Sequence, residues 1–143
     1  MKANAQTEAA IKKVMDTFLE AYKNRDLESL MSVFPEDADQ IMYGTGADEK
    51  RVGKEQIKKQ AQRDWAQLEE IAFSFPWVQI SAQGPVAWVA GDGTGKGKVG
   101  GQKFQFPLRM TGVFVQRGDD WFLVQSHISV PAPAQDEGDS VSV

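Results

Sequence analysis

The sequence contains no cysteine and only one histidine, His127, among its 143 residues. Without cysteine, the chain can form no disulfide, thiolate nucleophile or cysteine-ligated zinc site. The carboxylates of segment 37–49 do not match a calcium-loop pattern, so we expect neither a metal site nor a cofactor. The lack of cysteine fits a reducing compartment, and the first residues lack the apolar core of a signal peptide. The expected location is therefore the cytoplasm.

Two further absences concern membranes and nucleic acids. No run approaches the roughly 18 consecutive apolar residues of a membrane-spanning helix. The chain carries 16 Lys and Arg against 20 Asp and Glu, a formal net charge of −4, and it has no basic stripe. Nucleic acids are bound through a concentrated positive surface, so this charge excludes them as expected partners. What remains is a chain that is 41% hydrophobic and long enough to build one core of its own.

Apolar residues at helical spacing predict three helices in the first half of the chain. The first has an apolar stripe from Ile11 to Tyr22, and Thr7 is its expected N-cap. Asp26 is suited to cap a short second helix, and a third is expected from Lys54 to about Leu68. A short strand is expected at 41–43, with a turn after it.

After Glu70 the pattern changes to four strands separated by turn-forming residues. Pro76 predicts a bulge or a sheet edge in the first of them. The glycine-rich segment 91–101 predicts a long flexible hairpin, because it lacks both the spacing of a phosphate-binding loop and a following helix. The predicted fold class is α+β, with three N-terminal helices packed on a curved, mainly antiparallel sheet. The four runs are IAFSFPWVQISA, PVAWVAGDGTG, KFQFPLRMTGVFV and WFLVQSHISV.

We expect one domain over residues 8–131. The polar residues 1–7 are expected to be loose. Residues 132–143 are acidic, small and interrupted by proline, which predicts a disordered tail.

Alternation along the last two strands predicts which side chains share a face. The more apolar set should face the helices, which leaves His127 on the outer face. A three-residue loop at Gly118–Asp120 would place Thr111 opposite His127 and Arg109 near Ser129. Large apolar groups on an outer sheet face indicate an interface, so we expect a homodimer through this face. The predicted dimer face comprises Arg109, Thr111, Trp121, Leu123, Gln125 and His127.

His127 has no acid beside it on that predicted face, which favours a structural or interface role over catalysis. The aromatic residues point instead to a cavity where the helices lean over the sheet. Tyr43 is the most interesting of them, because its hydroxyl needs a partner. The predicted pocket residues are Phe18, Tyr22, Tyr43, Trp65, Phe75, Phe106, Met110 and Ile128.

Three segments carry a family resemblance: FLEAYKNRDLESLMSVF, VGKEQI and RMTGVFVQRGDDWFLVQSHISVP. With them the chain resembles the nuclear transport factor 2-like superfamily, and especially its SnoaL-like branch, from about Glu8 to Pro131. The resemblance implies a cone-shaped fold with a central pocket. It also implies an outer sheet face that forms dimers. The superfamily includes ketosteroid isomerases, polyketide cyclases, dehydratases and kinase association domains.

The chemistry of two of these groups can be compared with this chain residue by residue. The positions that match the isomerase tyrosine, base and sheet acid are Phe18, the neighbourhood of Tyr43, and Met110 or Thr111. None of them holds the required group. The anion-binding arginines of the kinase association domain match Gly112 and Ile128, so that site is also missing.

The sequence therefore predicts a protein that binds a small apolar molecule in its pocket and has no identified catalytic residue. One alternative is an isomerase, cyclase or dehydratase acting on a polyketide- or steroid-like substrate. In that case Asp64, Tyr43 or His127 must supply the acid–base group, and one of them should have a perturbed pKa inside a cavity. The other alternative is an assembly module with a filled core and no ligand.

Overall fold

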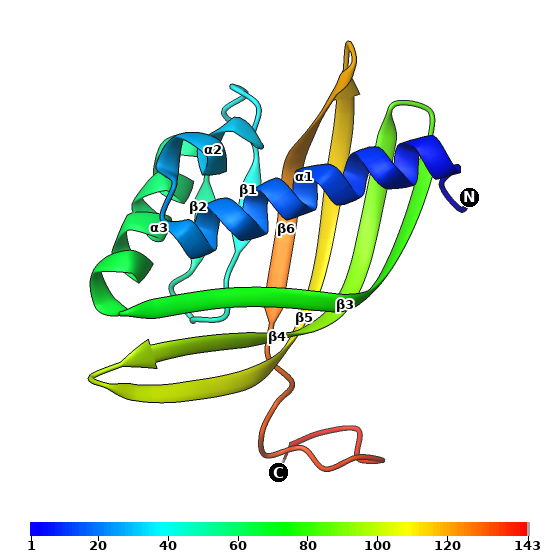
Figure 1. Ribbon diagram of the computed structural model, residues 1–143. Helices are drawn as coiled ribbons and strands as arrows, with labels where there is room; N and C mark the ends of the chain where they lie inside the picture. Colours follow the sequence, from blue (N-terminus) through cyan, green and yellow to red (C-terminus); the bar gives the residue numbers. More distant parts are fainter. Residues whose placement is uncertain (143) are drawn as a thin grey trace.

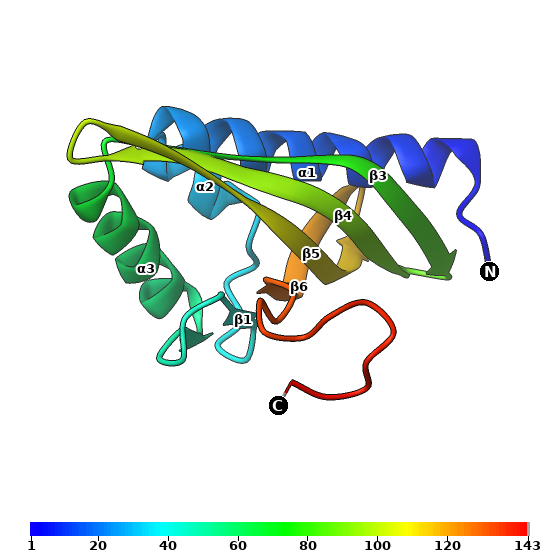
Figure 2. The ribbon, with the colours of Figure 1, turned by 90° about the horizontal axis from the view of Figure 1, so that it is seen from below.

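The computed structural model describes residues 1–142 and has three helices packed against a six-stranded sheet (Figure 1). Figure 2 shows the sheet bending beneath α1, with α3 at one end of the molecule. These features confirm the predicted α+β class and the curved, mainly antiparallel sheet. The elements are α1 (Ala5–Asn24), α2 (Leu27–Ser32), β1 (Ile41–Tyr43), β2 (Lys50–Val52), α3 (Lys54–Gln67), β3 (Glu70–Gln83), β4 (Val86–Val99), β5 (Gln102–Arg117) and β6 (Asp120–Ser129).

The helix ends follow from local capping. α1 begins after Asn4, whose side chain accepts a hydrogen bond from the Thr7 amide at 2.8 Å, so the cap lies three residues before the predicted one. Arg25, with φ of 58°, ends the helix in the left-handed conformation. Asp26 caps α2 as predicted. α3 begins at Lys54 and ends one residue before the predicted Leu68.

The predicted loose N-terminus is wrong, because its first residues pair with the edge of β3. The amide of Ala3 donates to the carbonyl of Ile80 at 3.2 Å, and Ala82 donates to the carbonyl of Met1 at 2.8 Å. Ala3 is buried as a result. This pairing satisfies backbone groups on an edge strand that would otherwise stay exposed.

The predicted disordered tail stays a prediction. Residues 132–142 form no helix or strand and are exposed to solvent. Val143, the last residue of that tail, lies outside the described residues.

The strand order is β2-β1-β6-β5-β4-β3, in which only the β1–β6 pair is parallel. The short strand β2 lies in the segment that was expected to be a turn. Pro76 lies in a β-bulge between Ser74 and Trp77 of the edge strand β3, which confirms the prediction made from that proline.

Segment 91–101 lies in the long β4–β5 hairpin, as predicted, but most of its glycines belong to strand β4 rather than to the turn. Gly91, Gly93, Gly95 and Gly97 alternate along β4, and the hairpin turn lies beyond them. A Cβ atom on Gly95 would lie 2.5 Å from the ring of Phe106, and one on Gly93 would lie 2.0 Å from a β3 carbonyl oxygen. The glycines therefore permit close approach of neighbouring groups on the inner face.

A second bulge, at Val124, reverses the expected alternation of β6. Phe114 pairs with Leu123 whereas Val113 pairs with Gln125, so Val124 is an extra residue without a partner on β5. Trp121 and Leu123 consequently belong to the buried core, each 8% exposed. Their predicted place on the outer dimer face is wrong, because strict alternation assumed an unbroken strand.

The same bulge explains why the register prediction for the far half of β6 is right. Arg117 pairs with Asp120, so the loop has two residues rather than the three expected. Val124 restores the missing residue, and Thr111 then pairs with His127 as predicted.

The core lies between α1 and the inner face of the sheet. Ile11 of α1 and Ala87 of β4 are fully buried, and Phe114 is 2% exposed. The apolar stripe of α1 covers this face along its length, which leaves the space beside α3 for the candidate site. Within residues 1–142, no helix has the length and apolar character needed to cross a membrane.

Deleting Val124 is expected to lower the free energy of unfolding by about 3 kcal/mol or more. The shortened strand must turn either Trp121 and Leu123 or Gln125 and His127 to the opposite face. Urea denaturation followed by circular dichroism measures the change. The control Val124→Ala keeps the residue and should cost only about 1 kcal/mol. A deletion variant as stable as this control would contradict the role of the bulge.

Candidate functional site

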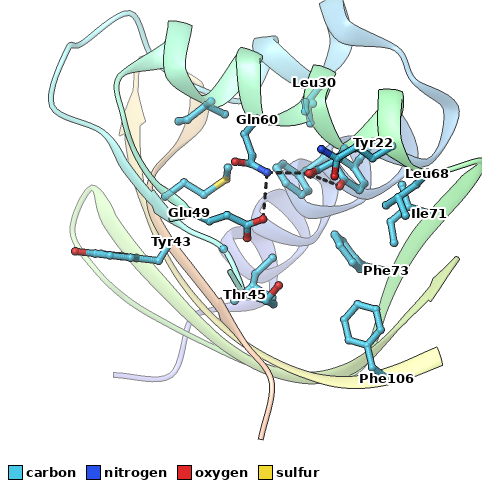
Figure 3. Close-up of a pocket in the computed structure, with 18 of the residues that line it drawn as sticks. Tyr22, Leu30, Tyr43, Thr45, Glu49, Gln60, Leu68, Ile71, Phe73 and Phe106 are labelled. Carbon is cyan, nitrogen blue, oxygen red and sulfur yellow. Dashed lines mark hydrogen bonds between the residues drawn. The ribbon is translucent and has the colours of Figure 1, made fainter. Parts of the chain in front are cut away.

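A cavity of about 260 Å³ lies between α1, α3, the loop after β1 and the inner face of the sheet (Figure 3). Most of its wall is aromatic or aliphatic, and a group of polar side chains that hydrogen-bond to one another forms one end. The aromatic rings belong to Phe18, Tyr22, Phe73, Phe104 and Phe106, and the polar end contains Glu49, Gln60 and Asp64.

The predicted pocket residues do not all line the same cavity. Phe18, Tyr22, Phe106 and Ile128 line this cavity. Phe75 and Met110 line a second, apolar cavity of about 50 Å³ instead, and Phe18 and Ile128 border both.

Two aromatic predictions need correction. Trp65 lines neither cavity; its indole Nε1 donates to the carbonyl of Tyr22 at 2.9 Å and holds α3 against α1. Tyr43 borders the cavity, but Figure 3 shows its ring pointing away from Gln60. That ring packs against His127, with 5.4 Å between ring centroids. The sequence predicted that both rings line the cavity, but helix and strand periodicity could not say which surface each ring covers.

The polar end is one hydrogen-bonded group contributed by α1, α3 and the β1–β2 loop. The Tyr22 hydroxyl donates to Oδ2 of Asp64 at 2.6 Å, and the Gln60 amide donates to Oδ1 of the same carboxyl at 2.8 Å. The Gln60 amide also donates to Oε1 of Glu49 at 3.3 Å. One amide therefore bridges two carboxyl groups (Figure 3).

Local structure explains how these side chains meet. Gln60 and Asp64 are four residues apart on α3 and so share one face of the helix. Arg25 donates to the carbonyls of Trp65 and Leu68, which ties the end of α1 to the end of α3.

Glu49 is directed into the cavity by the turn that contains it. Its Oε2 accepts from the Gly46 amide at 2.9 Å, and its Oε1 accepts from Arg63 at 3.0 Å. A Cβ atom on Gly44 would lie 2.2 Å from this carboxylate, so a side chain there would displace the carboxylate from its present position. Neither Glu49 nor Gln60 was predicted from the sequence to line the pocket. One feature of the sequence could have indicated this polar end: Gln60 is a polar residue beside Ile57 and Ala61 on the apolar side of α3.

Burial raises the pKa of the Asp64 carboxyl above its ordinary value, and the nearby Glu49 acts in the same direction. The hydrogen bonds from Tyr22 and Gln60 oppose this rise. Burial also raises the pKa of Tyr22, and the Asp64 carboxylate adds to the effect. Tyr22 therefore remains the hydrogen-bond donor, and Asp64 is the member of the pair that titrates.

Asp64 thus combines a perturbed pKa with a place in a cavity, the condition expected of an acid–base residue. His127 does not line this cavity; it is exposed beside Tyr43. Residues 1–142 contain no group of three or more His, Cys, Asp or Glu that could hold a metal ion.

The remaining residues of the predicted dimer face are accessible. Arg109, Thr111, Gln125 and His127 are exposed on the outer side of β5 and β6. Their role in an interface stays a prediction.

Known proteins of similar sequence and structure identify the family and the fold of this chain. A family model described as SnoaL-like domain matches residues 11–133. Among curated proteins, none matches the chain. The fold is similar to that of a proposed dehydratase of the NTF2-like family from Streptomyces avermitilis, with a TM-score of 0.81 at 20% identity. That alignment covers 90% of this chain and 99% of the other.

Two further solved structures share the fold. An NTF2-like superfamily protein from Salmonella enterica has a TM-score of 0.83 at 15% identity, and the match covers 96% of this chain and 99% of that one. A proposed aromatic ring hydroxylase from Novosphingobium aromaticivorans has a TM-score of 0.82 at 16% identity, covering 92% and 94% respectively. At these identities the likeness establishes the fold alone, whereas the family model over residues 11–133 confirms the SnoaL-like resemblance found in the sequence.

Replacing Asp64 with Asn should make the protein gain stability relative to the wild type as the pH rises. The folded pKa of Asp64 lies above its ordinary value of 3.8. The stability that its protonated form contributes is thus present below that value and is lost as the pH rises through the folded pKa. Melting temperatures of both proteins between pH 4 and 7 measure the difference.

The control Asp26→Asn should show the opposite trend. The hydrogen bonds from Ser29 lower the pKa of the Asp26 carboxyl, so the stability of the wild type relative to this variant rises as the pH rises from that lowered pKa through the ordinary value of 3.8. The profile of this control is therefore followed down to about pH 2. Parallel pH profiles for wild type and Asp64→Asn would contradict the burial argument.

Proposed function

The chain belongs to the SnoaL-like domain family, and from this membership we propose that its cavity binds a small molecule with an apolar body and one polar group. The observation that carries the proposal is the cavity itself. Its wall is aromatic and aliphatic, and its polar groups converge at one end, as is usual for small-molecule sites. A cavity of this kind also speaks against an assembly module with a filled core.

The volume favours a ligand of modest size. At about 260 Å³ the cavity is smaller than the roughly 300 Å³ at which drug-sized sites begin. It corresponds to roughly nine water molecules at about 30 Å³ each. A compound with one ring and a short chain is a better match than a four-ring steroid.

A second candidate function is acid–base catalysis of the isomerase, cyclase or dehydratase type. It is favoured by the raised pKa of Asp64, which brings a carboxyl group closer to the pH at which it exchanges protons efficiently. Tyr22 would hold Asp64 in place through its hydrogen bond. The likeness to a proposed dehydratase agrees with this candidate at the level of the fold.

We also propose that two copies of the chain associate through the outer face of the sheet. Arg109, Thr111, Gln125 and His127 form the polar part of this face. Trp77 on β3, 52% exposed, adds a large apolar side chain beyond them. Exposed aromatic groups beside polar ones are typical of protein interfaces.

At least one of a set of single-ring ligands with different polar ends should raise the melting temperature of the wild type, and filling the cavity should abolish the effect. Suitable probes are alkylbenzenes that end in an amine, an alcohol or a carboxylate. At 100 times its dissociation constant, a ligand stabilises the fold by about 2.7 kcal/mol, or roughly 5–10 °C. The variant Ile128→Trp extends a larger side chain into the cavity and should show no shift.

Val99→Trp is the matched control, because it adds the same side chain at an exposed site at the end of β4. It should keep the full shift. If no probe shifted the wild type, or if Ile128→Trp shifted as much as Val99→Trp, the cavity would not be the binding site.

Light scattering at micromolar concentration should give twice the mass of one chain. Thr111→Glu places a charge in the middle of the proposed interface and should weaken association about a hundredfold, because a buried charge without a partner costs roughly 3 kcal/mol. His127→Ala should weaken association more than it affects ligand binding. Lys59→Glu, exposed on α3, serves as the control and should remain dimeric. A monomeric wild type would contradict the proposed interface.

A further inference from the structure

We propose that the polar group of the ligand is a protonated amine, bound beside Glu49 and Asp64 at the polar end and facing the aromatic wall. This inference rests on the proposed function, because it assigns the chemical class of the molecule in the same cavity. It follows from hydrogen-bonding capacity, from charge and from the arrangement of the rings.

The polar end offers acceptors rather than donors. The Tyr22 hydroxyl already donates to Asp64, and the Gln60 amide already donates to both carboxyl groups. Gln60 is only 5% exposed, and its Oε1 atom is buried and accepts no hydrogen bond from residues 1–142. An unsatisfied buried acceptor is costly, so a ligand that donates several hydrogen bonds fits this end best.

Charge leads to the same class of ligand. Among the described residues that line the cavity, Glu49 and Asp64 are the charged ones, and no Lys, Arg or His is among them. The nearby Arg63 directs its two terminal nitrogens to Asp48 and Glu49. A carboxylate or phosphate would therefore meet like charges, whereas an ammonium group would meet opposite ones. The side chains of Thr45 and Gln67 line the cavity from exposed positions and do not change this balance.

The aromatic wall suits an organic cation. The Tyr22 ring stacks on Phe73 with 5.2 Å between centroids and on Phe18 with 6.2 Å. Figure 3 shows Phe73 and Phe106 across the cavity from Glu49 and Gln60. Aromatic faces attract ammonium groups and also bury the carbon skeleton attached to them. A metal ion is a poorer match, because only two carboxyl groups line the cavity and residues 1–142 contain no group of three possible protein ligands.

Three probes of matched length separate the possible classes of ligand: 4-phenylbutylamine, 4-phenylbutanol and 4-phenylbutyrate. Titration calorimetry at pH 7 measures the affinity of each for the full chain. The amine should bind about tenfold more tightly than the alcohol, and the carboxylate should not bind measurably. An alcohol or carboxylate that binds as tightly as the amine would overturn this inference but leave the proposed function intact. Failure of all three at millimolar concentration would overturn both.

Glu49→Gln tests the origin of the preference. It should lower the affinity for the amine about tenfold and leave that for the alcohol nearly unchanged. Glu55→Gln makes the same substitution at an exposed position on α3 and should alter neither affinity. Melting temperatures establish that each variant folds. Asp64→Asn removes the other carboxyl group and replaces Glu49→Gln if that variant does not fold. An amine preference that survives both changes would overturn the inference.

Discussion

The sheet must cover α1 along its length and still leave a cavity beside α3, and the bulge at Val124 allows both. On one side of this residue, Trp121 and Leu123 point into the core; on the other, Ser126 and Ile128 point inward and Ile128 reaches the cavity. In an unbroken strand, Trp121 and Ile128 would point to opposite faces of the sheet, so only one of them could point inward. The bulge gives each half of β6 the face that its own sequence favours.

At the open end, the structure keeps polar groups inside by bonding them to one another. Tyr22 and Asp64 are 42 residues apart in sequence but only 2.6 Å apart at their bonded oxygens. Arg25 and Trp65 hold the same two helices together through backbone carbonyls. Because helix packing fixes the carboxyl group, its desolvation is not relieved by movement toward water. The arrangement raises the pKa of Asp64, and a buried carboxylate lowers the stability of the fold at neutral pH. In return, the polar end of the cavity is formed before any ligand binds.

The sequence predicted what depends on local periodicity and composition. The stripe from Ile11 to Tyr22, the cap at Asp26 and the four long strands follow from spacing alone, and Pro76 located its own bulge. The bulge at Val124 could not be predicted, because no proline or glycine marks it. Thr111 and His127 were paired correctly only because an error in the loop length equalled the extra residue.

In the site, too, the sequence predicted the apolar residues but not the polar ones that depend on long-range packing. Phe18, Tyr22 and Phe106 lie where an apolar pocket was expected, whereas Glu49 reaches the cavity through a turn whose conformation depends on glycines and on Arg63. Composition could indicate an apolar cavity, but only long-range packing could give it an acidic end.

The two roles considered for that end are physically coupled. An ammonium group beside Asp64 would stabilise the ionised carboxylate and lower the pKa that burial has raised. With an amine bound, Asp64 could accept a proton from the ligand or fix its position, but it would be a poor general acid. A neutral ligand would leave the pKa high and keep the proton available. The charge of the ligand therefore decides which acid–base role is open to Asp64, so ligand class and reaction class cannot be assigned independently at this site.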